Sequence, residues 1–161
     1  MIGADMKKID WKNLSYYDFI GFVAVTAILL FALYFGGLWY ATYDYRIQMR
    51  DQMVGMYQQL PEPLPVVSED YGVHQRWLVF YIDGVKILNK PQPENVINEY
   101  KKALEKEGWD AEREYVRNDK NKTYGINMRK GEFVFSVSAR ENRDSINIHL
   151  IKRDWIYHMG L

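Results

Sequence analysis

The three histidines are the first residues whose type suggests chemistry, because imidazole carries protons near neutral pH and binds metals. They are His74, His149 and His158, and the chain has no cysteine. A metal site needs three or four nitrogen, oxygen or sulfur ligands that converge on one point. Each histidine falls on a separate expected element without a second ligand at metal-binding spacing. We therefore interpret them as ordinary surface or half-buried side chains and expect no metal.

Carboxylates are the second group, because paired acids in a cleft perform acid–base catalysis when their pKa values are shifted. Glu69 and Asp70 fall in a stretch that we expect to be a linker. The other clustered acids alternate with basic residues, which is typical of a solvated face: Glu105, Glu107, Asp110, Glu112 and Glu114. The sequence also lacks a phosphate-binding glycine loop and a nucleophile elbow. We expect a non-catalytic protein without a cofactor.

The charge balance argues against a further class of partner. The chain has 161 residues, with 21 Lys and Arg against 21 Asp and Glu, so its formal net charge is zero. Nucleic-acid binders use a basic excess to displace counterions from phosphates. We therefore expect no nucleic-acid partner. The absence of cysteine excludes disulfides but fits an oxidising and a reducing compartment equally.

One apolar run dominates the N-terminal part of the chain. Residues 19–40 read FIGFVAVTAILLFALYFGGLWY, without a charged residue. About 20 residues at about 1.5 Å each span the hydrocarbon core of a bilayer. Aromatic residues that favour lipid headgroups flank the run: Trp11, Tyr16, Tyr17, Trp39, Tyr40, Tyr43 and Tyr45. The pattern predicts an N-terminal tail of residues 1–18 and a transmembrane helix at 19–40, uncleaved because no small-residue cleavage site ends it.

The flanking basic residues predict the direction of this helix. Lys7, Lys8 and Lys12 precede it, whereas Arg46 and Arg50 follow it. Cytoplasmic flanks carry the larger basic charge. We therefore expect a single-pass protein of the cytoplasmic (inner) membrane, with a cytoplasmic N-terminus and an extracytoplasmic C-terminal domain.

Small residues recur at four-residue spacing along the same helix. Ala32 pairs with Gly36, and Gly37 pairs with Ala41. Such pairs let two membrane helices approach closely. These four residues are helix-docking candidates, and their partner would be another integral membrane subunit or a second copy of the chain. The alternative is that Gly and Ala are simply common in membrane helices.

The segment after the apolar run is expected to be a helix and then a linker. Residues 41–60 contain no proline and place apolar side chains mostly three or four positions apart. This juxtamembrane helix would pack on a partner, lift the domain away from lipid, or pack on its own domain. Pro61, Pro63 and Pro65 end the helix. We expect residues 61–72 to be an extended linker that contains the domain boundary.

Residues 73–154 have the pattern of a small α+β domain. Residues 77–82 read WLVFYI, a strand expected to turn at Asp83-Gly84. A helix begins at Pro93 and ends at Gly108, where glycine suits a left-handed cap. Alternating segments predict further strands at residues 109–117, 123–129, 132–140 and 145–153. The expected fold class is therefore α+β: one N-terminal transmembrane helix, then one helix packed on a four- or five-stranded, mainly antiparallel sheet.

The stretch PENVINEYKKALEKEGWD carries a resemblance to known domains. Its matching positions are Pro93, Glu94, Val96, Ile97, Tyr100, Lys101, Ala103, Leu104, Gly108 and Trp109. Residues 73–152 resemble small extracytoplasmic domains of bacterial lipoproteins and anchored proteins. The resemblance implies a fold and a location rather than an activity. Where such lipoproteins have a lipobox cysteine, this chain has the apolar run.

The C-terminal tail, residues 155–161, is unusually apolar for a chain end. Its interaction candidates are Trp155, Ile156, Tyr157, Met159 and Leu161. These side chains either close over the protein's own core or dock on a partner.

Together these features favour a non-catalytic, single-pass accessory subunit of a larger membrane protein complex. Its helix would lie in the lipid bilayer, and its helix and outer domain would contact integral membrane protein subunits. The alternative is a self-standing sensor or ligand-binding module of the bacterial cell envelope. Stabilisation of the domain by an added ligand would distinguish the second from the first.

Overall fold

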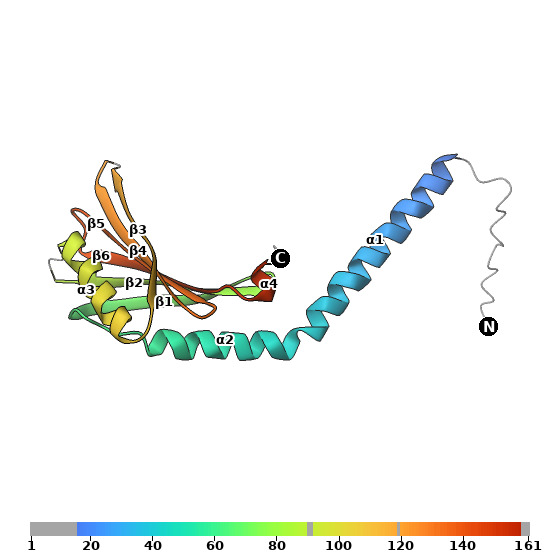
Figure 1. The fold of residues 1–161 in the computed structure, drawn as a ribbon. Coiled ribbons are helices and arrows are strands. Elements are labelled where there is room, and N and C mark those ends of the chain that lie inside the picture. Colours follow the sequence, from blue (N-terminus) through green and yellow to red (C-terminus); the bar gives the residue numbers. More distant parts are fainter. Residues whose placement is uncertain (1–15, 90–91, 119, 159–161) are drawn as a thin grey trace. The chain divides into compact units, whose positions relative to one another are not determined.

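The computed structural model describes residues 16–89, 92–118 and 120–158. The chain divides into two compact units, Met1–Thr42 and Tyr43–Leu161. The first contains α1 (Tyr16–Ala41), and the second contains α2 (Tyr43–Gln58), α3 (Pro93–Lys106), α4 (Trp155–His158) and the strands (Figure 1). The expectations for Trp11, the N-terminal lysines, Met159 and Leu161 lie outside the described residues.

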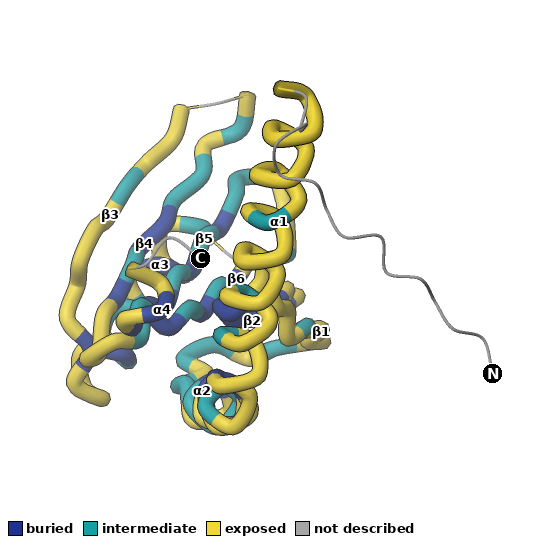
Figure 2. Tube along the Cα trace, turned by 90° about the vertical axis from the view of Figure 1, so that its right-hand side faces the viewer, coloured by how far each residue is buried: buried dark blue, intermediate teal, exposed yellow. Residues whose placement is uncertain are grey.

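The first unit is a single apolar helix. α1 has 26 residues, and Asp18 in its first turn is its one charged residue. None of its residues is buried within the protein, and Figure 2 shows it exposed along almost its whole length. Its length and composition suffice to cross a membrane. The apolar helix expected at residues 19–40 is therefore confirmed.

The second unit is built on a six-stranded antiparallel sheet. Its strands are β1 (Val66–Arg76), β2 (Val79–Leu88), β3 (Asp110–Asn118), β4 (Lys122–Lys130), β5 (Phe133–Arg140) and β6 (Ser145–Lys152). The order across the sheet is β1-β2-β6-β5-β4-β3, so β1 and β3 form the two edges. β3 to β6 follow one another as the expected antiparallel meander. β6 then pairs with β2 and joins the meander to the first hairpin.

The α+β class is confirmed, but the sheet has more strands than the four or five expected. The additional strand is β1, whose first part is the stretch 66–72 expected to be a linker. Its backbone pairs with β2 over nearly its whole length. Prolines favour an extended backbone, and an edge strand is extended too. The proline pattern therefore does not distinguish a linker from an edge strand.

The turn expected at Asp83-Gly84 is not found, because β2 continues through both residues. The first hairpin instead turns at Trp77 and Leu78, between β1 and β2. Gly84 instead leaves room for the Tyr57 side chain, since a Cβ there would lie 2.5 Å from the hydroxyl oxygen of Tyr57. Glycine inside a strand often marks such a close approach rather than a turn.

Within the described residues, α2 and α3 pack on the same face of the sheet, where a single helix was expected. α3 contacts β3, β4 and β5, and its four buried side chains are those its helical spacing indicates: Val96, Ile97, Tyr100 and Leu104. Gly108 follows it with a φ of +80°, the predicted left-handed cap. α2 contacts β2 and β6, with Met49, Met53 and Tyr57 buried. The juxtamembrane helix thus packs on its own domain.

The core lies between these two helices and the sheet. Alternate residues of the central strands point into it, as their patterns predict: Phe135, Val137, Ala139, Ile146, Ile148 and Leu150. Burying one large apolar side chain contributes about 1.5–3 kcal/mol relative to leaving it exposed. In Figure 2 the central strands carry the dark blue of buried residues, whereas the edge strand β3 is mostly yellow. The alternate residues of the same strands form the opposite face of the sheet.

Candidate functional site

Two of the three histidines lie in one row on the sheet face opposite α2 and α3. His74 of β1 stacks on Tyr81 of β2, with ring centroids 5.3 Å apart, and His149 of β6 lies on the other side of Tyr81 at 5.6 Å. The Nδ1 atom of His149 is 2.7 Å from an oxygen of Asp83. These residues meet only through the pairing of β1, β2 and β6. Spacing along the sequence could not indicate this row.

The histidine row presents a surface rather than a metal centre. Tyr81 separates the two imidazoles, and His158 lies apart on α4. Across residues 16–89, 92–118 and 120–158, no three His, Cys, Asp or Glu side chains converge to hold a metal. The His149 and Asp83 side chains are both exposed, and an exposed pair contributes little to stability. The row is therefore suited to contact with another molecule.

A groove of about 590 Å³ adjoins this row where β1 turns into β2. Its lining combines aromatic and apolar groups with one guanidinium: Arg76, Trp77, Val79, Tyr81, His149, Ile151 and Tyr157. Trp77 has a φ of 55°, which is rare for a bulky residue. The sequence analysis missed this groove because it assigned the turn to Asp83-Gly84. Only one side of this turn carries a sequence signal, because residues 79–82 are apolar whereas residues 68–76 are mostly polar.

The C-terminal candidates divide between the protein's own core and its surface. Ile156 is fully buried, whereas Trp155 and Tyr157 are exposed. Asp154 accepts a hydrogen bond from the Tyr45 hydroxyl at 2.5 Å and another from the backbone N–H of Tyr157 at 3.1 Å. The tail is therefore fixed to the start of α2. Trp155 and Tyr157 remain available for a partner.

Polar contacts hold the start of α2 on the sheet. Burial, with the Asp154 carboxylate adding to it, raises the pKa of Tyr45 well above its usual range, so its hydroxyl stays a proton donor. Lys152 donates to Gln52 of α2 at 3.3 Å and lies over the Tyr45 ring at 5.6 Å. These contacts make the first three turns of α2 part of the folded domain.

A charged cluster holds the other end of α2. Lys86 of β2 is only 5% exposed, and its ammonium lies 2.6 Å from Glu62 and 3.3 Å from Glu69. Tyr57 of α2 donates to the same Glu69 at 2.6 Å. Burial first, and Glu69 next, raise the pKa of Tyr57. Glu69, expected in a linker, is thus a structural partner of a buried lysine and a buried tyrosine.

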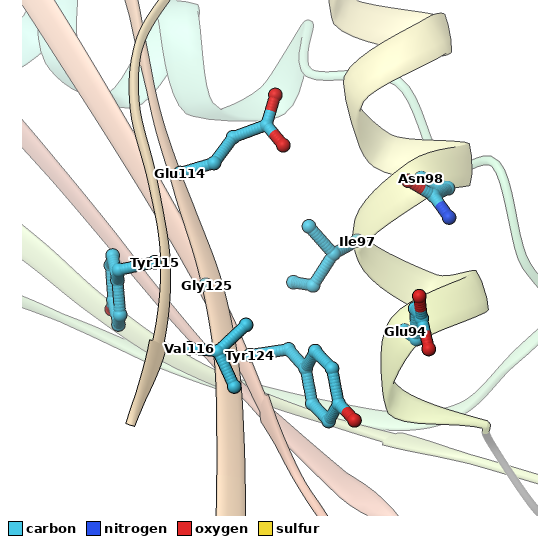
Figure 3. Close-up of a pocket in the computed structure, with 8 residues that line it drawn as sticks. All are labelled: Glu94, Ile97, Asn98, Glu114, Tyr115, Val116, Tyr124 and Gly125. Atoms are coloured by element: carbon cyan, nitrogen blue, oxygen red, sulfur yellow. The ribbon is translucent and has the colours of Figure 1, made fainter. Parts of the chain in front are cut away.

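A smaller hollow of about 260 Å³ lies between α3 and the strands β3 and β4 (Figure 3). Ile97, Val116 and Tyr124 give it an apolar lining. Glu114 at its rim forms an ion pair with Lys101 of α3, and this contact raises the pKa of Lys101. Glu94 and Asn98 of α3 complete the polar part of the lining.

The four helix-docking candidates lie on α1 and are all exposed: Ala32, Gly36, Gly37 and Ala41. A Cβ added at Gly36 or Gly37 would meet nothing within 4 Å. Their small size therefore has no packing purpose within the first unit. Docking of a second membrane helix on them stays a prediction.

The described part of the second unit gathers exposed aromatic and apolar side chains and pairs its buried lysines with acids. Exposed aromatic and apolar groups gather on one face and at one end of the sheet, while Lys86 and Lys101 are paired with acids. The remaining large pKa shifts belong to tyrosines held in the fold. No family model matches this chain, and searches of the curated proteins and of the solved structures also find no match.

Proposed function

We propose that this chain is a non-catalytic, single-pass accessory subunit of a larger membrane protein complex. The exposure of α1 is the observation that carries the proposal: its 26 residues are almost entirely apolar, and none is buried in the protein. Apolar surface of this size needs apolar surroundings, and a bilayer supplies them at the matching thickness. The helix then acts as an anchor for the second unit.

The uncovered sheet face supports the protein-contact part of the proposal. Val85 and Ile87 of β2 are exposed, although β2 lies between β1 and β6 and is not an edge strand. They alternate with Lys86 and Leu88, which are buried under the helices, so they lie on the opposite face. A solvated sheet face is usually polar. Exposed β-branched residues there favour a protein partner.

The flanking charges support the proposed topology. Lys7, Lys8 and Lys12 would lie on the cytoplasmic side of a bacterial inner membrane, and Tyr43–Leu161 would lie outside. The subunit would then offer its sheet face to the extracytoplasmic parts of its partners.

The groove at the first hairpin favours a second candidate function, a self-standing sensor or binding module. Small-molecule sites combine apolar and aromatic lining with a few polar groups. The groove has Trp77, Tyr81 and Tyr157 together with Arg76. Under this alternative a ligand, rather than a subunit, would stabilise the second unit.

Purification of the tagged full chain from its native membrane in mild detergent, followed by mass spectrometry, tests the first proposal. We expect a stoichiometric set of membrane subunits with the wild type and a reduced set with Val85→Lys and Ile87→Lys. Val116→Lys is the matched control, because Val116 is exposed on the edge strand β3. A lone monomer or homodimer from the wild type would contradict the accessory-subunit proposal.

A further inference from the structure

One end of the second unit brings together three exposed aromatic residues. The Trp155 ring of α4 lies 6.0 Å from the ring of Tyr45, in the first turn of α2. Tyr157 of α4 and Trp77 of the first hairpin line the same groove. The hairpin, α4 and the start of α2 therefore occupy the same end of this unit (Figure 1). We define the aromatic end as Trp77, Trp155 and Tyr157.

Covalent continuity ties this end to the apolar helix. Only Thr42 separates Ala41, the last residue of α1, from Tyr43, the first residue of α2. Two residues span at most about 7 Å. If α1 crosses a bilayer, the first turn of α2 is therefore held at headgroup level by the chain itself. Tyr45 in that turn contacts both Asp154 and Trp155.

The chemistry of the aromatic end fits the boundary between headgroups and acyl chains. Trp and Tyr concentrate there because one part of each ring system is apolar and another part is polar. Trp155 is 52% exposed and Trp77 is 41% exposed. Arg76 lines the adjoining groove, and the Arg153 guanidinium lies 5.7 Å from the centre of the Tyr157 ring. Arg153 is paired with Glu112 at 3.1 Å, so Arg76 is the cation that complements lipid phosphates.

The backbone at Trp77 adds an independent observation. Its φ of 55° lies in the left-handed region, where glycine is favoured and a bulky side chain is strained. Strain of this kind persists mainly at functional positions. Glycine would make the turn with less strain, so a tryptophan at this position has a cost in backbone conformation.

We propose that the aromatic end binds the headgroup region of the same bilayer that α1 spans. This inference rests on the proposed membrane anchoring and adds a second, peripheral contact. The contact keeps α4 and the first hairpin against the lipid surface, and the histidine row and groove then lie next to it.

Site-directed spin labelling of the full chain tests the proposal, and the absence of cysteine makes single-cysteine variants direct to produce. Labels replace Trp77, Trp155 or, as the control, the exposed Val116 of β3. The protein is reconstituted in vesicles of phosphatidylethanolamine and phosphatidylglycerol. We expect collisions with oxygen to rise several-fold relative to collisions with a water-soluble nickel chelate at positions 77 and 155, and not at 116.

The outcomes separate this inference from the anchor itself. If alkaline carbonate extracts the protein from vesicles, the membrane anchor fails. If the protein resists extraction but the three labels are equally accessible to nickel, the anchor holds and the aromatic end does not bind lipid. Protection of positions 77 and 155 from both reagents would indicate cover by a second copy, and would also overturn the proposal.

The variant Trp77→Gly distinguishes a lipid contact from a structural role. Because glycine relieves the positive φ, we expect thermal unfolding of the domain to be unchanged or shifted upward. The label at position 155 should nevertheless become more accessible to nickel. A lower unfolding temperature with unchanged accessibility would show that Trp77 serves the fold alone.

Discussion

At the scale of single residues, Gly84 and Tyr57 show how a small side chain permits a polar contact. The Tyr57 hydroxyl reaches across Gly84 to Glu69, while its ring lies 4.7 Å from the ring of Tyr71. Glu69 also faces the buried Lys86. The absence of a Cβ at one strand position thus allows the end of α2 to be attached to the sheet.

We predict that Gly84→Ala displaces the Tyr57 hydroxyl and lowers the free energy of unfolding by about 1–3 kcal/mol, the range for a buried polar group that loses its partner. Gly55→Ala is the control, since a Cβ there would meet nothing within 4 Å and alanine favours the helix. It should raise the free energy of unfolding by roughly 0.5–1 kcal/mol. Urea unfolding followed by near-ultraviolet circular dichroism measures both variants, and equal effects would refute the close-contact explanation.

The raised pKa values of three tyrosines lead us to predict that the protein loses stability at alkaline pH. Burial raises the pKa of Tyr45, Tyr57 and Tyr100 above the ordinary value of 10.0, with help from neighbouring carboxylates. The raised pKa values contribute stability that is fully present below about pH 10, the unfolded pKa. That stability is lost as the pH rises toward the folded values, because only the unfolded chain then releases the protons.

Tyrosinate absorbance against pH measures this response. We expect most of the 13 tyrosines to ionise first and the last ones to ionise together with unfolding. A single reversible titration of all tyrosines, with the circular dichroism unchanged, would contradict the prediction.

At the scale of elements, the sequence predicts the helices and strands that bury one face, because their apolar residues recur at helix or strand spacing. α3, β5 and β6 have this pattern and lie where expected. β1 does not, because most of an edge strand is exposed and its residues show no period. The apolar spacing of α2 indicates a helix but not the surface on which it packs. The groove was missed for the related reason that it depends on which strands pair.

Packing of α2 on the sheet leads to a further prediction. Met53 is 0% exposed, whereas Ile47 on the same helix is 37% exposed. Met53→Ala should lower the free energy of unfolding by about 2–5 kcal/mol, as for other buried apolar truncations. Ile47→Ala should change it by only about 0.5 kcal/mol. Urea unfolding of the two variants checks this, and similar values would mean that α2 is a free stalk.

At the scale of the whole molecule, the second unit has a buried hydrophobic core, whereas the first unit is a single exposed apolar helix. The buried core of the second unit contains no described residue before Met49, and the partly buried residues packed against it begin at Tyr45. The described residues of this core all belong to the second unit, so this unit has a hydrophobic core of its own.

We accordingly predict that residues 43–161, produced alone, form a folded domain. Its urea unfolding should be a single cooperative transition, because one core connects both helices with the sheet. Measurement of the full chain in detergent provides the comparison. Loss of the cooperative transition in the shorter chain would show that the second unit depends on α1.

The burial of α2 also affects resistance to oxidants. All sulfur in this protein is in its seven methionines, since cysteine is absent. Met49 and Met53 are enclosed between α2 and the sheet, and Met128 is enclosed within the same core. Oxidation makes a methionine side chain polar and would prevent it from repacking. An oxidant can therefore reach the sulfurs of Met49 and Met53 only when α2 detaches, so brief openings of this helix limit how long the protein survives in an oxidising environment.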